Sequence, residues 1–164
     1  MDWQGNSGPH NARNAVRADM TQDRRYRRSS IMRMAVHYQL RHCRDMFDVE
    51  AVILADRRGL MVAAADEEAE LSRVLSAYAP LLTRASDRPT QARIMESING
   101  YLPSTLREQL SVRRFDVMGE ELFLCTLGGC GARKEMATCR AVSGVRRIVL
   151  GMTEATRRSA MAAA

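Results

Sequence analysis

The sequence predicts an α+β fold built on an antiparallel sheet. Two short apolar runs, residues 52–55 and 60–63, flank a polar tetrapeptide whose last residue, Gly59, can take the positive φ of a tight turn. A second pair of β-prone runs lies within residues 112–127. Segments with helical periodicity precede, separate and follow these pairs. The predicted order is therefore α-β-β-α-β-β-α, with four to five strands flanked by three main helices.

Length and composition fit one domain with tails. The chain has 164 residues, is 46% hydrophobic and holds one Trp, four Tyr and three Phe, so the core must consist mainly of aliphatic residues and Met. No apolar run approaches the ~18 residues of a membrane span, which predicts no membrane insertion. The polar N-terminus lacks the apolar stretch of a signal peptide. We therefore expect a cytoplasmic protein whose four cysteines are reduced.

The net charge of +6 comes almost entirely from arginine, since Lys134 is the single lysine. Residues 1–28 contain six Arg and three Asp and few periodic apolar positions, which predicts a disordered basic tail. Its Arg-rich part, residues 13–28, fits an acidic partner, a nucleic-acid backbone or an anionic membrane surface. A solvated tail that aids solubility fits the same composition.

The predicted folded domain spans residues 29–158 and opens with a helix capped by Ser29 or Ser30. This helix ends near residue 47, where the first hairpin begins. Its apolar face recurs at spacings of three and four and consists of Met32, Ala35, Val36, Leu40, Cys43 and Phe47.

The second helix is predicted to begin at Asp66 as its N-cap. Acidic residues at positions 67, 68 and 70 then stand at the positive end of the helix dipole. Pro80 interrupts the pattern, and because apolar residues continue beyond it we expect a kink. The apolar stripe consists of Leu71, Val74, Leu75, Tyr78 and Leu82.

Residues 85–111 carry mixed signals. Residues 87–89 (Asp-Arg-Pro) and Asn99-Gly100 indicate turns on either side of a short helix. Thr105 and Glu108 have the spacing of a capping box, which predicts a helical turn near residues 105–110.

A second hairpin and a final helix complete the domain. Gly119-Glu120 supplies the predicted turn, and the helix is expected over residues 132–158, with residues 159–164 frayed. Gly144 and Gly151 cost helix stability and are expected where the backbone packs closely on the sheet. The buried stripe of this helix is predicted as Cys139, Val142, Val145, Ile148, Val149 and Met152.

No catalytic or metal motif accompanies these elements. Structural zinc sites show paired Cys knuckles, and the chain has no second knuckle beside Cys125 and Cys130. Cys125 and Cys139 are expected to point into the core, and Cys130 is either a reactive thiol at a helix N-terminus or an inert one. The three histidines support no nucleophile–base pair. The sequence therefore predicts a protein that is not an enzyme and holds no cofactor.

The glycine-rich loop after the second hairpin is a candidate anion site. It joins a strand to a helix, where free backbone N–H groups can hold a phosphate. The candidate residues are Gly129, Gly131, Arg133 and Lys134, although the spacing is not that of a Walker A motif. A simple turn explains the same residues.

Three segments, residues 49–60, 121–128 and 144–149, resemble the roadblock/LC7 family. The first has the order strand, Asp, turn, Gly, strand, and the last resembles the C-terminal helix. The resemblance implies a roadblock/profilin-like fold and a non-catalytic homodimer that acts as a scaffold or regulates a Ras-like small GTPase. It implies a partner surface on the second helix at Arg73, Ser76, Leu81 and Arg84. The alternatives are nucleic-acid binding through the tail and a GAF- or PAS-like small-molecule sensor.

Overall fold

The computed structural model describes residues 30–162. The predicted tail at residues 1–28 lies outside this range, so its disorder and its binding of nucleic acid remain predictions. The elements in chain order are a leading helix (residues 30–47), β1 (Ala51–Asp56), β2 (Met61–Ala65), α2 (Ala69–Arg84), α3 (Arg88–Asn99), the 3-10 helix η1 (Ser104–Gln109), β3 (Ser111–Val117), β4 (Glu120–Leu127) and α4 (Gly131–Ala162). The predicted α+β class is confirmed.

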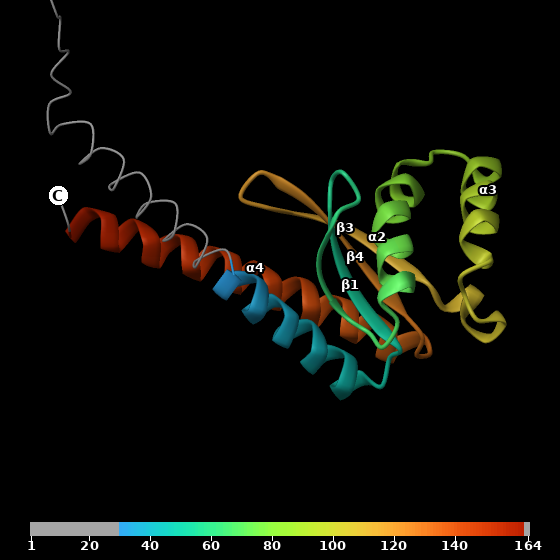
Figure 1. Cartoon of the computed structure of the whole chain (residues 1–164), viewed down its shortest axis with the longest axis horizontal. Coiled ribbons are helices and arrows are strands. Elements are labelled where there is room, and N and C mark those ends of the chain that lie inside the picture. The colour runs from blue at the N-terminus through green and yellow to red at the C-terminus, as the bar shows by residue number, and fades with distance from the viewer. Residues whose placement is uncertain (1–29, 163–164) are drawn as a thin grey trace, which may run out of the picture.

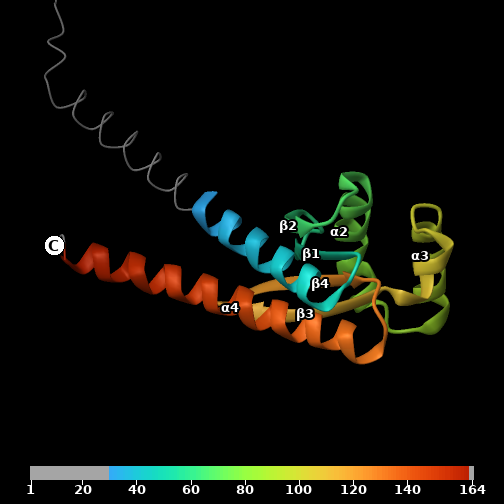
Figure 2. The same ribbon diagram turned by 90° about the horizontal axis from the view of Figure 1, so that it is seen from below.

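The sheet has four strands within the described range, in the order β2-β1-β4-β3, and every neighbouring pair is antiparallel. Each hairpin contributes one central strand and one edge strand. The leading helix and α4 cover one face of the sheet, α2 covers the other, and α3 packs against α2 on the outside (Figures 1 and 2).

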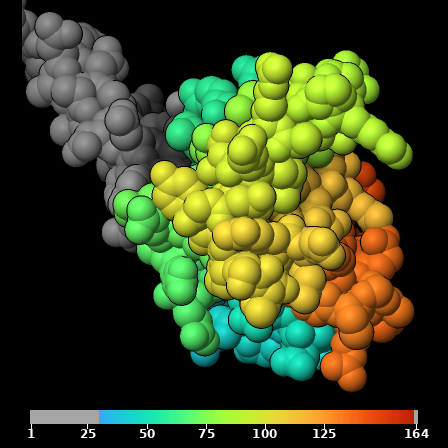
Figure 3. Space-filling view, turned by 90° about the vertical axis from the view of Figure 1, so that its right-hand side faces the viewer, coloured from blue at the N-terminus to red at the C-terminus, as the bar shows by residue number. Residues whose placement is uncertain are grey.

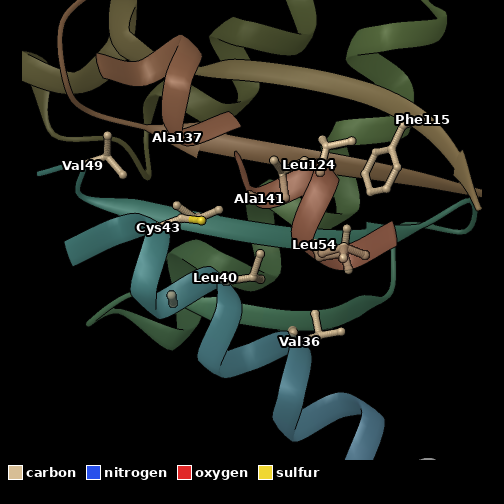
Figure 4. Packing of buried hydrophobic residues seen from close by; sticks show 14 of the residues in the cluster. Val36, Leu40, Cys43, Val49, Leu54, Phe115, Leu124, Ala137 and Ala141 are labelled. Carbon is tan, nitrogen blue, oxygen red and sulfur yellow. The ribbon is translucent and has the colours of Figure 1, made fainter. Parts of the chain in front are cut away.

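The central strands β1 and β4 are mostly apolar, because helices bury both of their faces over most of their length. Ile53 and Phe123 belong to the core on the α2 side, whereas Leu54 and Leu124 belong to the core beneath α4 and the leading helix (Figure 4). This arrangement explains why β1 reads as a continuous apolar run with no polar alternation. Cys125 is buried on the α2 side, which confirms its predicted place in the core.

The start of α2 differs from the prediction. The helix begins at Ala69, and the residue at its N-cap is Glu68, whose side chain makes no capping hydrogen bond. The carboxylate of Asp66, the predicted cap, instead accepts the hydroxyl hydrogen of Ser72. Helical residues continue on both sides of Pro80, so the proline does not end the helix.

The segment between α2 and β3 is more helical than its sequence indicates. Asp87, predicted in a turn, is the N-cap of α3, and its carboxylate accepts the backbone N–H of Thr90 at 3.0 Å. The helical turn predicted near residues 105–110 is confirmed as η1. The predicted capping box is absent, because Pro103 occupies the N-cap and makes no side-chain hydrogen bond. Together α3 and η1 form the outer surface at this end of the molecule (Figure 3).

The helix α4 is longer than predicted and is helical to Ala162, so residues 159–162 continue it. Cys139 is exposed on α4, which corrects its predicted burial. Gly144 is buried, and the atoms nearest to an added Cβ belong to Gln39 of the leading helix, where the prediction placed the sheet. Gly151 is exposed and an added Cβ would meet nothing within 4 Å, so close packing does not explain it. No helix within residues 30–162 is long and apolar enough to cross a membrane.

Replacing Gly151 with alanine is expected to raise the free energy of unfolding by about 1 kcal/mol, because alanine is the better helix former and the site has room for its Cβ. Urea denaturation followed by circular dichroism measures the change. Gly100→Ala is the matched control at an open position just beyond a helix, where the expected change is smaller. An unchanged or lowered stability in the Gly151 variant would contradict the prediction.

Candidate protein-interaction surface

The turn of the first hairpin is held by the side chain of Asp56. Its Oδ1 accepts the backbone N–H groups of Arg58 at 2.8 Å and Leu60 at 2.9 Å. Burial alone would raise the pKa of this carboxyl, but the N–H donors of Leu60 and Arg58 more than offset that effect, and the pKa lies below its ordinary value. The turn is therefore a fixed feature of the surface at neutral pH.

This turn lies directly against the backbone of α2. Gly59 has a φ of 79°, and a Cβ added to it would stand 3.0 Å from both the Cα and the carbonyl oxygen of Ala77. The carbonyl oxygen of Ser76 would be 3.3 Å away. Because Pro80 has no N–H to offer that carbonyl, the turn approaches α2 at the point where its hydrogen-bond ladder is interrupted.

Exposed apolar side chains flank this contact on both elements. Leu60, next to the turn glycine, is 55% exposed, and Leu81, one helical turn beyond Ala77, is 50% exposed. Arg73 is exposed one turn before Ala77 and makes no hydrogen bond or ion pair with the described residues. We call Leu60, Arg73, Ala77 and Leu81 the hairpin–α2 patch.

Two of the four residues predicted for a partner surface are placed differently. Ser76 is 1% exposed and lies beneath the surface, so its side chain is not available to a partner. Arg84 donates to the carboxylate of Glu121, which also pairs with Arg114 at 3.0 Å. The guanidinium of Arg84 lies 5.5 Å from the centre of the Phe123 ring. Arg84 thus connects the C-terminal end of α2 to the sheet.

The glycine-rich loop contacts the chain around Val49 and Glu50. An added Cβ on Gly128 would stand 2.9 Å from the backbone N of Glu50, and one on Gly129 would stand 2.8 Å from Val49 Cγ1. The two basic residues predicted for an anion site already have partners. Lys134 Nζ donates to the carbonyl of Gln109 at 3.3 Å, and Arg133 lies 3.8 Å from Asp48. Anion binding by Gly129, Gly131, Arg133 and Lys134 therefore remains a prediction, and close packing accounts for Gly128 and Gly129.

The four cysteines form two classes. Cys43 and Cys125 are buried, and burial raises the pKa of both thiols, that of Cys125 to about 12. Cys130 and Cys139 are exposed, and Arg113 donates to the sulfur of Cys139 at 3.2 Å. Within residues 30–162, no group of three or more His, Cys, Asp or Glu side chains could hold a metal ion.

Two thiols are expected to react quickly with Ellman's reagent at pH 8 in the folded protein, because thiolate attack requires both exposure and deprotonation. Cys130 and Cys139 are the expected pair. Cys43 and Cys125 are expected to react only after denaturation in guanidinium chloride. Mass mapping of the modified peptides identifies the sites, and fast modification of Cys125 in the folded protein would contradict its burial.

The fold and this surface define an α+β protein with helices on both faces of an antiparallel sheet and an exposed patch where a hairpin meets α2. No protein-family model and no curated protein matches the chain. One solved structure with a similar arrangement of elements is that of Myxococcus xanthus MglB. It is 8% identical in sequence, with a TM-score of 0.47, and the match covers 73% of this chain and 91% of that chain.

Proposed function

We propose that this chain is a cytoplasmic, non-catalytic, homodimeric regulatory or scaffold protein of the roadblock/LC7 type that acts on a Ras-like small GTPase. The element order supports the proposal, since two antiparallel hairpins joined by α2 match the order that the roadblock-like segments imply. The observation that carries it is the hairpin–α2 patch. Its leucines stay exposed where the hairpin turn lies against α2, whereas Leu71 and Leu75 of the same helix are buried.

The charge around the patch favours an acidic protein partner. Arg57 and Arg58 are exposed in the adjoining turn, and Arg73 is exposed on α2. Arg58 pairs with Asp56 at 3.4 Å, but Arg57 and Arg73 make no ion pair with the described residues. An apolar centre with a basic rim has the composition of a protein-interaction surface, in which arginine is enriched.

Homodimer formation is tested by size-exclusion chromatography with light scattering at micromolar concentration. The expected mass is twice the 18.4 kDa of the chain. A strict monomer across this range would contradict the dimer, while leaving the contact with a GTPase to be tested separately.

Contact with a small GTPase is tested by a pull-down from native extract, with and without a GTP analogue, and identification by mass spectrometry. Wild-type protein is expected to retain a small GTPase in a nucleotide-dependent manner, and Leu81→Glu is expected to lose it. Met136→Glu is the matched control, because Met136 is 49% exposed on α4, outside the patch. Equal retention by both variants, or retention of no small GTPase by wild type, would overturn the proposal.

A further inference from the structure

The leading helix and α4 run antiparallel across the same face of the sheet (Figure 2), and Gln39 of the leading helix packs against Gly144 of α4 at their crossing. A Cβ added to Gly144 would clash with the Gln39 side chain. On one side of this crossing the helices pack tightly, because α4 presents the small residues Ala137 and Ala141 to Leu40 and Cys43 (Figure 4).

On the other side of the crossing the two helices enclose a pocket of about 360 Å³. The tip of the β3–β4 hairpin closes one end of it. This volume lies in the range of small-molecule sites, which are concave, mostly apolar and fixed by few polar groups. The apolar lining includes Met32, Val36, Leu54, Val62, Val145 and Val149.

Residues of the hydrophobic core form the floor of the pocket. Val36, Leu54 and Val145 are almost completely buried, and the first two point into the space between the helices and the sheet (Figure 4). Three of the lining residues, Arg33, Glu120 and Thr153, are polar or charged, and all three are exposed. A ligand in the pocket therefore meets an apolar interior and a charged rim.

We propose that this pocket binds the hydrocarbon chain of a monocarboxylate amphiphile, with the carboxylate at Arg33. The guanidinium of Arg33 makes no ion pair with the described residues, and a planar guanidinium suits a carboxylate. Glu120 on the same rim repels a second negative charge, which favours a single carboxylate over a phosphate dianion. This site lies on the face of the sheet opposite to α2 and does not rest on the proposed function.

Binding is tested with the neutral fluorescent probe N-phenyl-1-naphthylamine and its displacement by straight-chain carboxylates. The probe is expected to bind at one site per chain. Octanoate, decanoate and dodecanoate are expected to displace it with affinities that rise about fourfold per methylene until the pocket is full. A chain-length effect below twofold per methylene, or no probe binding, would overturn the proposal.

Matched tryptophan variants locate the site. Val149 lines the pocket, whereas the neighbouring Leu150 is exposed and does not line it. Val149→Trp is expected to reduce probe affinity at least tenfold and Leu150→Trp to leave it unchanged. Thr153→Trp, at the exposed rim, gives the same test if Val149→Trp fails to fold by circular dichroism. Unchanged affinity in the folded pocket variant would overturn the assignment.

The carboxylate contact is tested with Arg33→Gln. Dodecanoate affinity is expected to fall about tenfold relative to wild type, and the affinity of dodecanol, which has no charge, is expected to stay constant. Equal losses for both compounds would overturn the role of Arg33. Probe binding that decreases as protein concentration rises would show that a second copy fills the pocket, which would also overturn the proposal.

Discussion

Gly59→Ala is expected to lower the free energy of unfolding by about 3 kcal/mol, through two independent effects. The φ of 79° places residue 59 in the left-handed region, which costs an L-residue about 1–2 kcal/mol. The new Cβ would also stand 3.0 Å from the Cα and the carbonyl oxygen of Ala77, which are backbone atoms that cannot rotate away. Relief requires the hairpin to move off α2.

Gly119→Ala separates the two effects. Gly119 occupies the turn of the second hairpin with a φ of 81°, and an added Cβ would meet nothing within 4 Å. This variant is expected to lose only about 1 kcal/mol, the conformational part alone. Urea denaturation of both variants gives the comparison. Equal losses would show that the contact between the turn and α2 contributes nothing, and would weaken the hairpin–α2 patch as a fixed surface.

Phe123→Ala is expected to cost about 4 kcal/mol, the largest effect among the substitutions considered. Among residues 30–162, Phe123 is the largest fully buried side chain, and it stands on the central strand β4, on the face covered by α2. Its removal leaves a cavity between elements that cannot collapse independently, because β4 is paired on both sides. The ring also lies beneath the guanidinium of Arg84, so that contact is lost as well.

Phe123→Leu is the control for Phe123→Ala, because leucine fills most of the volume and is expected to lose about 1 kcal/mol. Chemical denaturation monitored by circular dichroism measures both variants. A loss below about 2 kcal/mol for the alanine variant would indicate that the core on the α2 side is loosely packed.

The first hairpin could be predicted because its signals are local. Two apolar runs and a glycine with room for positive φ lie within fifteen residues, and strand pairing follows directly from them. The start of α2 could not be predicted in the same way. Asp66 and Glu68 stand two residues apart and both suit a helix N-terminus. The Asp66 carboxylate accepts the hydroxyl hydrogen of Ser72, a residue inside the helix, and the local sequence does not distinguish this contact from a cap.

The residues predicted for the partner surface could not be located from the local sequence either. The family resemblance implies a partner surface on the exposed side of α2 that includes Ser76 and Arg84. Ser76 is buried where the turn of the first hairpin lies against the α2 backbone, and Arg84 donates to Glu121 of β4. Such contacts between elements leave no periodic signal. One local signal did exist, since a glycine inside a long helix, Gly144, marks the helix crossing beside the pocket.

The strand order has a consequence for how the molecule opens. Each hairpin closes through neighbours in sequence, but β1 pairs with β4 over a long sequence separation, with Ala51 opposite Leu127. Pairing β1 with β4 carries the larger loop-closure cost, because these strands are far apart in the sequence. The β1–β4 pairing therefore forms only when both hairpins and their helices are in place. We therefore expect the amide hydrogens of the β1–β4 pairing to be the slowest to exchange with deuterium, at the rate of global unfolding.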